Sequence, residues 1–498
     1  MGIPGLHSFI ASHPAFATPY QFNSLSDRMV IDGNSLLHFI TRSTVHHNYG
    51  RYNMLAHQLI LSPASSSLTI FDGALPPSKK SVRLSRFLDR IRKVKSLVYD
   101  DNIVLGPLAM NVALDTLPST TVAKLEADGL VAQIARREGS PILSFDSDYY
   151  IFKNVKYVPL DSVVPSSPSS FQGRLYTNDI TRKVLNLPSA NLLPAFAVLV
   201  GCDNVVDVLA FKSLSTHIPA LGKGRTGNQT KSRITTISSV LARCGSHDSI
   251  TALTRLVSTA DCKDLVSVAK SYMDDVDCGE MNTQYASDHG NKRQYSPRLL
   301  EIITNRSFWA DLSEGVTEYV RRGDRVSEEL IELVPEVGLA PLPQAHIYIH
   351  TILEDGDRLE PTQLPLTHQP IITASIYLAS RLCTETVEVI IVVGLYCLSH
   401  PIDTLKNTDY ESRNQNTWNA IHIAAELQTV LESAYLVAEV LKLSLEFRKA
   451  HWQCFDGWIL AAALTDDEYA QSLKSQLSDT EKMSLDIATR ALEYRLKS

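Results

Sequence analysis

The first half of the chain alternates short β-rich apolar runs with stretches of helical periodicity. The runs RMVID (28–32), LTIFD (68–72) and PILSFD (141–146) each follow turn residues and precede a turn or helix signal. Strands that alternate with helices predict an α/β domain, in which a mostly parallel central sheet is flanked by helices. The longer apolar run ILSFDSDYYIF (142–152) predicts a strand that enters a core.

The second half has a different pattern. Residues 274–298 are polar and poor in aliphatic side chains, which predicts a linker or long loop. From about residue 299, Leu- and Ala-rich amphipathic stretches such as 425–447 predict a mainly α-helical domain. We therefore expect an α/β domain over 1–273, the linker, and a helical C-terminal domain over 299–498.

The apolar run 389–398 is the longest in the chain. It has only half of the roughly 20 residues that cross a bilayer, so it predicts a buried helix and no membrane partner. The N-terminus lacks the pattern of a signal peptide, and we find no clear targeting signal. Seven cysteines, none in a CxxC pair, predict reduced thiols in an intracellular protein rather than a disulfide framework or a zinc site.

The overall charge is mildly acidic. The formal net charge of −7, with 44% hydrophobic and 20% charged residues, is typical of an ordinary globular protein. This balance argues against a small basic protein that coats DNA. It leaves room for an enzyme with a local basic patch beside an acidic metal centre.

All three β-rich runs end in aspartate, at Asp32, Asp72 and Asp146. Since the carboxyl ends of parallel strands form one edge of a sheet, these side chains converge if the strands are neighbours. Asp148 follows two residues after Asp146, and in an extended chain both would point to the same side, where a cation would compensate their charges. A single strand-end aspartate is commonly a helix N-cap, but three in succession favour a metal centre.

Further acids stand at two other positions. The stretch KLEADGLVAQIA (124–135) predicts a helix capped near Ser119, with Glu126 and Asp128 close to its start. Residues two apart on a helix differ by about 200°, so either the helix begins later or one acid acts through water. A solvated helix face is an equal alternative for this pair. Asp203 ends the apolar run VLVGCDN (198–204).

The candidate ligands are all carboxylates. They are Asp32, Asp72, Glu126, Asp128, Asp146, Asp148 and Asp203. Oxygen ligands without histidine or thiolate suit Mg²⁺ or Mn²⁺ rather than zinc. So many negative charges exceed what one ion compensates, so we expect two ions, an arrangement that can hydrolyse phosphodiester bonds.

With these acids in order, the sequence resembles the flap endonuclease/XPG-type (PIN-like) nucleases, most closely their Asteroid branch. The resemblance covers roughly the first 205 residues. The motifs that carry it are MGIPGL (1–6), VIDGNSLLH (30–38), FDG (71–73), EAD (126–128), SFDSDYYIF (144–152) and GCD (201–203). It implies a Mg²⁺- or Mn²⁺-dependent, structure-selective endonuclease, a hydrolase with a two-metal mechanism. It further implies DNA substrates with single-stranded flaps or ends, a role in DNA repair and a nuclear location.

The resemblance also assigns roles to the acids. Asp32 and Asp72 match the first metal site of the family. The second site is matched by Asp146, Asp148 and Asp203. Glu126 and Asp128 match a pair of which the second usually contacts metal.

Other parts of the chain match or depart from the family. The resemblance places the chain start, and with it Gly2, near the active site. The stretch between Asp72 and Glu126 is short for the family, which implies a reduced helical arch. Lys223 and Arg225 belong to a Gly/Lys/Arg loop that stands where a DNA clamp is expected.

A basic segment (78–95) follows the second β-rich run. Its candidate phosphate contacts are Lys79, Lys80, Arg83, Arg86, Arg90 and Lys93. Most of them recur every three or four residues, so they share one face of a predicted helix, while an apolar stripe within 84–98 can pack on the domain. Positive charge beside a metal site suits a nucleic-acid backbone, although a solvated helix face would show the same pattern.

Two functions are compatible with this sequence. The first is the metal-dependent nuclease, with DNA favoured over RNA as its substrate. The alternative is a non-catalytic scaffold with a nuclease fold, which binds nucleic acid, including RNA, or binds protein partners through the helical C-terminal domain.

Overall fold

The computed structural model describes most of the α/β region and most of the C-terminal helices. The described residues are 2–23, 27–43, 67–72, 85, 88–89, 92, 108–117, 119–123, 126–167, 170–202, 227–256, 262–273, 316–322, 325–331, 363–379, 381–400, 418–440 and 443–497. The chain divides into two compact units. Unit 1 comprises Met1–Phe39, Ile60–Arg83 and Leu117–Pro297, and unit 2 comprises Ile40–Leu59, Leu84–Thr116 and Arg298–Ser498.

This division differs from the domain limits expected from the sequence. Residues 84–116, which we assigned to the α/β domain, group with the C-terminal helices in unit 2. The expected linker (274–298) lies outside the described residues. The limits 1–273 and 299–498 therefore stay a prediction.

The centre of unit 1 is a parallel sheet. Strand β2 (Val30–Asp32) pairs in parallel with β3 (Leu68–Phe71) on one side and with β5 (Pro141–Ser144) on the other. Strand β4 (Thr120–Val122) continues the parallel order beyond β3, and β6 (Lys156–Pro159) continues it beyond β5. All residues of β2 and β5 are buried, as expected for interior strands that helices cover.

An antiparallel margin completes the sheet. The full order is β1-β8-β6-β5-β2-β3-β4, and β7 pairs with β8 off this path. The three added strands, β1 (Thr18–Asn23), β7 (Val164–Ser167) and β8 (Ser170–Thr177), all pair antiparallel. The predicted α/β class with a mostly parallel central sheet is confirmed, and the antiparallel margin is an addition that the sequence pattern did not indicate.

Helices pack on this sheet and beside it. Helix α6 (Ala127–Glu138) packs against β2, β3 and β5 through a buried apolar face. It ends at Gly139, whose φ of 67° forms a left-handed cap. The short α1 (Leu6–Ala11) adds two buried side chains to the same core. Helix α2 (Gly33–Ser43) follows directly on β2.

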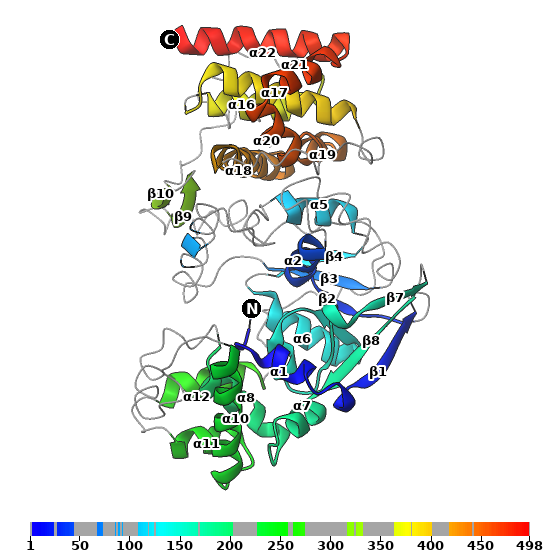
Figure 1. Ribbon diagram of the computed structural model, residues 1–498, viewed down its shortest axis with the longest axis vertical. Coiled ribbons are helices and arrows are strands. Elements are labelled where there is room, and N and C mark those ends of the chain that lie inside the picture. The colour runs from blue at the N-terminus through cyan, green and yellow to red at the C-terminus, as the bar shows by residue number, and fades with distance from the viewer. Residues whose placement is uncertain are drawn as a thin grey trace. The chain divides into compact units, whose positions relative to one another are not determined.

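A helical cluster extends the core of unit 1 (Figure 1). At its centre is α8 (Leu193–Val200), of which every residue is buried. Around it pack α10 (Gly227–Arg243), α11 (Ser249–Leu256) and α12 (Cys262–Ser271). Because α8 has no polar face, it requires neighbours on all sides, and these three helices provide them.

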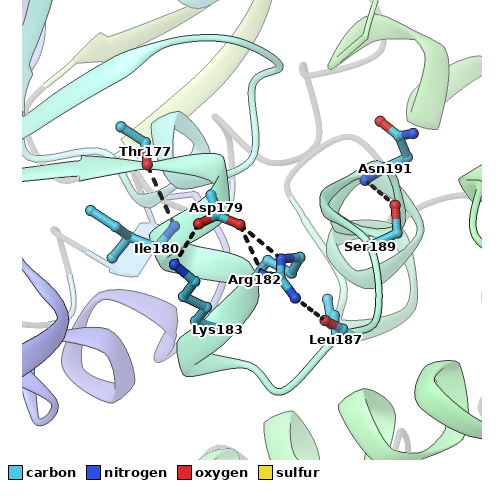
Figure 2. Close-up of polar contacts among 8 residues, drawn as sticks. All are labelled: Thr177, Asp179, Ile180, Arg182, Lys183, Leu187, Ser189 and Asn191. Carbon is cyan, nitrogen blue, oxygen red and sulfur yellow. Dashed lines mark hydrogen bonds and ion pairs between the residues drawn. The ribbon is translucent and has the colours of Figure 1, made fainter.

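Helix α7 (Asn178–Val184) leads from the sheet to this cluster (Figure 2). The Thr177 hydroxyl caps it by accepting a hydrogen bond from a backbone N–H three residues on. Asp179 forms ion pairs of 2.9 and 2.7 Å with Arg182 and Lys183. The hydrogen bond from Lys183, followed by that from Arg182, lowers the pKa of the Asp179 carboxyl. Arg182 also donates to the Leu187 carbonyl, which fixes the chain as it leaves the helix.

Unit 2 is mainly helical, as predicted. Its described C-terminal helices are α16 (Gln369–Leu378), α17 (Thr384–Ser399), α18 (Trp418–Val440), α19 (Leu445–Gln453), α20 (Gly457–Thr465), α21 (Asp467–Ser475) and α22 (Asp479–Lys497). The apolar run 389–398 lies in α17 and is largely buried, as expected. Gly394 allows α16 and α17 to approach closely, because a Cβ at this position would overlap Ile371.

Two features of unit 2 were not expected, a β-hairpin and the packing of a helix from the first half of the chain on the C-terminal helices. Strands β9 (Val316–Arg322) and β10 (Arg325–Ile331) form an antiparallel hairpin within the region assigned to helices. Helix α5 (Leu108–Thr116) packs against α18 and α19. Asp115 at its end accepts hydrogen bonds from the Tyr435 hydroxyl at 3.0 Å and the Trp452 ring N–H at 2.9 Å. No described helix is long and apolar enough to cross a membrane.

Candidate metal centre

Asp32 lies at the carboxyl end of β2, where it is 4% exposed. Its Oδ1 accepts a hydrogen bond from the Ser35 N–H at 3.0 Å, which is the pattern of an N-cap for α2. Its Oδ2 accepts hydrogen bonds of 2.7 Å from the hydroxyls of Ser35 and Ser144. Asp32 therefore caps a helix and also faces the neighbouring strand β5, from which Ser144 comes.

Asp72 directly follows β3. Its Oδ2 accepts a hydrogen bond of 2.7 Å from the Asn34 side chain, and its own N–H donates to the Asn34 side-chain Oδ1 at 3.2 Å. Its Oδ1 accepts a hydrogen bond of 2.8 Å from the Ala127 N–H in the first turn of α6. The negative charge of Asp72 thus lies at a helix N-terminus, where the helix dipole stabilises it.

Asp146 and Asp148 belong to a turn, which we call the acidic turn (146–148). The expected strand 142–152 is wrong in its second half, because β5 ends at Ser144 and a 3₁₀ helix covers 147–150. The Asp146 Oδ1 accepts a hydrogen bond of 3.0 Å from the Asp148 N–H, which favours the turn over a continued strand. Both aspartates are nearly buried, at 9% and 6% exposed.

The pair Glu126 and Asp128 straddles the start of α6. The expected cap near Ser119 is wrong, because β4 follows that residue and the helix begins at Ala127. Glu126 is extended and precedes the helix, whereas Asp128 lies in its first turn and accepts a hydrogen bond of 3.3 Å from the Tyr149 hydroxyl. The first of the two alternatives, a later helix start, therefore describes this segment.

The electrostatics of Asp128 indicate that the acids lie close together. Burial raises the pKa of the Asp128 carboxyl well above its usual range, and the charges of Asp146, Asp32, Asp72 and Asp148 raise it further, in that order. The hydrogen bonds described above, from serine, asparagine, tyrosine and backbone groups, all come from neutral donors. They orient the carboxylates without adding positive charge. The repulsion among the acids around Asp128 favours a bound cation or protons.

The chain start lies against the acidic turn. Gly2 has a φ of +73°, and a Cβ on it would overlap the Asp146 Oδ1 and lie 2.9 Å from the Asp148 Oδ1. Ser147 holds the next residue from both sides: its Oγ accepts from the Ile3 N–H at 2.8 Å and donates to the Ile3 carbonyl at 3.1 Å. Only glycine fits at position 2 in this arrangement.

The remaining candidate residues lie outside the described part of the chain. They are Asp203, Lys79, Lys80, Arg83, Arg86, Arg90, Lys93, Lys223 and Arg225. Within the basic segment, the backbone is helical at the four described positions 85, 88, 89 and 92. Asp89 and Arg92 form an exposed ion pair of 2.7 Å there.

Sequence reasoning missed the neutral residues that orient the acids. These are Asn34, Ser35, Ser144, Tyr149 and Tyr272. The first four stand inside the motifs VIDGNSLLH and SFDSDYYIF, so their position offered a signal, although only Ser35 is close in sequence to the aspartate carboxylate that it contacts. Tyr272 lies 124 residues from its partner Asp148 and offered none.

The carboxylates fit a hard divalent cation in their chemistry. Their oxygens are the ligands that Mg²⁺ and Mn²⁺ prefer, and their mutual repulsion makes a cation favourable. Within the described part of the chain, no three histidine, cysteine, aspartate or glutamate side chains form a ready-made metal cluster. Because like charges repel, we expect the side chains to draw together when a cation binds.

Two curated proteins are similar to this chain. Asteroid homolog 1 of Schizosaccharomyces pombe (strain 972 / ATCC 24843) is 24% identical over 366 residues, which cover 67% of this chain and 66% of the relative. Protein asteroid of Drosophila melanogaster is 28% identical over 175 residues, which cover 32% and 20%. The chain thus spans less than two thirds of either relative. The predicted resemblance to Asteroid proteins is confirmed, and no family model matches the sequence.

Solved nuclease structures are also similar to it. The catalytic core of Rad2 in complex with DNA substrate matches with a TM-score of 0.33 and 17% identity, over 63% of this chain and 95% of that chain. T5 5′-exonuclease with bound zinc ions matches with a TM-score of 0.28 and 15% identity, over 49% and 99%.

Proposed function

We propose that this protein is a Mg²⁺- or Mn²⁺-dependent, structure-selective endonuclease that hydrolyses phosphodiester bonds. The observation that carries the proposal is the gathering of carboxylates from neighbouring parallel strands at one sheet edge. Asp32, Asp146 and Asp148 are nearly buried there. Burial, and then the charges of these acids and of Asp72, raise the pKa of Asp128. Such a concentration of negative charge is costly in a folded protein unless a cation compensates it.

The described residues suggest how the centre would hold its ions. Asp32, Asp72, Asp128, Asp146 and Asp148 would supply carboxylate oxygens, and Glu126 and Asp203 are further candidates by resemblance. When bound, divalent ions would activate water and stabilise the leaving oxygen of a phosphodiester. The serine and asparagine partners would keep the carboxylates oriented, since each donates a hydrogen bond to them.

The substrate is proposed on the motifs and the charge pattern. DNA with single-stranded flaps or ends is the substrate that the resemblance implies. The chain start beside the acidic turn would shape the space next to the reacting phosphate. The basic segment (78–95) would bind the phosphate backbone without reading its bases. A role in DNA repair and a nuclear location stay predictions.

A cleavage assay tests this function. Purified protein is incubated with end-labelled flap, overhang, hairpin and blunt duplex DNA, and with an RNA flap, in Mg²⁺, in Mn²⁺ or with EDTA. We expect metal-dependent cutting of the branched or single-stranded ends and little cutting of blunt duplex. Binding of these substrates without cutting in either metal would favour the scaffold alternative instead.

A further inference from the structure

Tyr272 reaches the acidic turn from the helical cluster. It directly follows α12 and is 1% exposed. Its hydroxyl donates a hydrogen bond of 3.2 Å to the Asp148 Oδ2. The ring packs edge-on against Phe152 with centroids 5.1 Å apart, and the Tyr272 carbonyl accepts from the Lys153 N–H at 3.0 Å. Ring and backbone contacts thus hold the hydroxyl in place independently of its bond to Asp148.

This contact distinguishes the two oxygens of Asp148. The Oδ2 is occupied by the Tyr272 hydroxyl, while the Oδ1 lies on the side of Gly2 and the chain start. An aspartate carboxylate can rotate about its side-chain torsions, and a fixed hydrogen-bond donor at one oxygen restricts that rotation. The orientation of Asp148 is therefore set by a residue from a different part of unit 1.

The chemistry of the donor is also suited to a cation site. A lysine or arginine in this place would orient Asp148 but would also cancel its charge. A phenol donates the same kind of hydrogen bond and carries no charge. The Tyr272 hydroxyl consequently fixes the geometry of the carboxylate without adding a positive charge beside it.

We propose that Tyr272 is a positioning residue of the metal centre, which holds Asp148 in the orientation that binds a divalent ion. This inference rests on the proposed metal-dependent function. Hydrogen-bond partners of metal ligands commonly contribute 10–100-fold to metal affinity. Through Tyr272, the packing of α12 in the helical cluster would determine the geometry of a ligand that follows β5.

Titration calorimetry of Mn²⁺ into the full-length protein tests the role. We expect Tyr272→Phe to lower Mn²⁺ affinity by about 10-fold, because the ring contacts remain while the orienting hydrogen bond is lost. The matched control is Tyr435→Phe. Tyr435 is equally buried and donates a comparable 3.0 Å hydrogen bond to Asp115 in unit 2. This control should bind Mn²⁺ like the parent.

Thermal unfolding without metal separates positioning from general damage. Each variant loses the hydrogen bond between a buried tyrosine and a carboxylate, so their unfolding midpoints should fall by similar amounts. The positioning role would be overturned if Tyr272→Phe bound Mn²⁺ like the parent, or if both variants lost Mn²⁺ affinity equally. Either result would leave the proposed function intact. A parent that binds no Mn²⁺ would overturn both.

Discussion

Replacing Asp128 by Asn should stabilise the protein when no divalent ion is present. Burial and four neighbouring carboxylates raise the pKa of Asp128 in the folded state, whereas its ordinary value is 3.8. At any pH between 3.8 and the folded-state pKa of Asp128, the folded protein therefore binds more protons than the unfolded chain. Stability is then lost as pH rises through the folded-state pKa, and the asparagine variant avoids this loss.

The size of the gain is limited by the pH of the experiment. Each pKa unit corresponds to about 1.4 kcal/mol, and about three units separate the ordinary pKa from pH 7. The free energy of unfolding at pH 7 should thus rise, by no more than about 4 kcal/mol. The asparagine side-chain oxygen can still accept the Tyr149 hydrogen bond, so little is lost in exchange.

Urea unfolding in EDTA at pH 4, 5, 6, 7 and 8 measures this effect. The advantage of Asp128→Asn should grow from near zero at pH 4 as the pH rises. Asp179→Asn is the control, because Asp179 is exposed and its pKa is lowered by its ion pairs, so its replacement should give no gain. If Asp128→Asn were less stable than the parent at pH 7, or if its advantage did not depend on pH, the carboxylates would not repel one another as we infer. The argument for a metal centre would then lose its basis.

Three further predictions concern the chain start and the basic segment. Gly2→Ala should lower Mn²⁺ affinity, measured by calorimetry, and stability, measured by thermal unfolding, more than Gly139→Ala does. Both glycines have a positive φ, but only a Cβ at position 2 would meet the acidic turn. A tag before Gly2 should slow cleavage more than a C-terminal tag does, and equal rates would contradict the placement of the chain start. Neutralising Arg83, Arg86 and Arg90 together should weaken binding to unrelated DNA sequences by similar factors. The slope of log affinity against log salt concentration should flatten by roughly one unit per lost phosphate contact, whereas unchanged binding isotherms would indicate a solvated helix face.

The strand ends could be predicted because their signal is local. Asp32, Asp72 and Asp146 each close an apolar run, and parallel neighbours bring such residues to one edge. The strand prediction for the acidic turn was wrong because the surrounding apolar residues are compatible with either a strand or a buried turn. What decides between them is a side-chain hydrogen bond, from the Asp148 N–H to Asp146, which competes with strand pairing.

Contacts between distant residues explain the other errors. The start of α6 is fixed in part by Asp72, which accepts a hydrogen bond from Ala127, 55 residues later. The placement of α5 depends on Asp115 and its partners Tyr435 and Trp452, more than 300 residues away. No periodicity or capping signal within a segment can reveal such partners.

The central claim, that the strand-end carboxylates form a catalytic metal centre, is tested most directly by the cleavage rate of Asp146→Asn. The rate is measured on an end-labelled DNA flap in Mg²⁺ and in Mn²⁺, beside the parent and the control Asp161→Asn, which removes an acid that pairs with His7. Since even the outer partners of metal ligands contribute 10–100-fold, we expect at least a 100-fold loss for Asp146→Asn, with the fold retained and the control unaffected. A folded Asp146→Asn protein that cuts the flap at the parent's rate in Mg²⁺ would contradict the account.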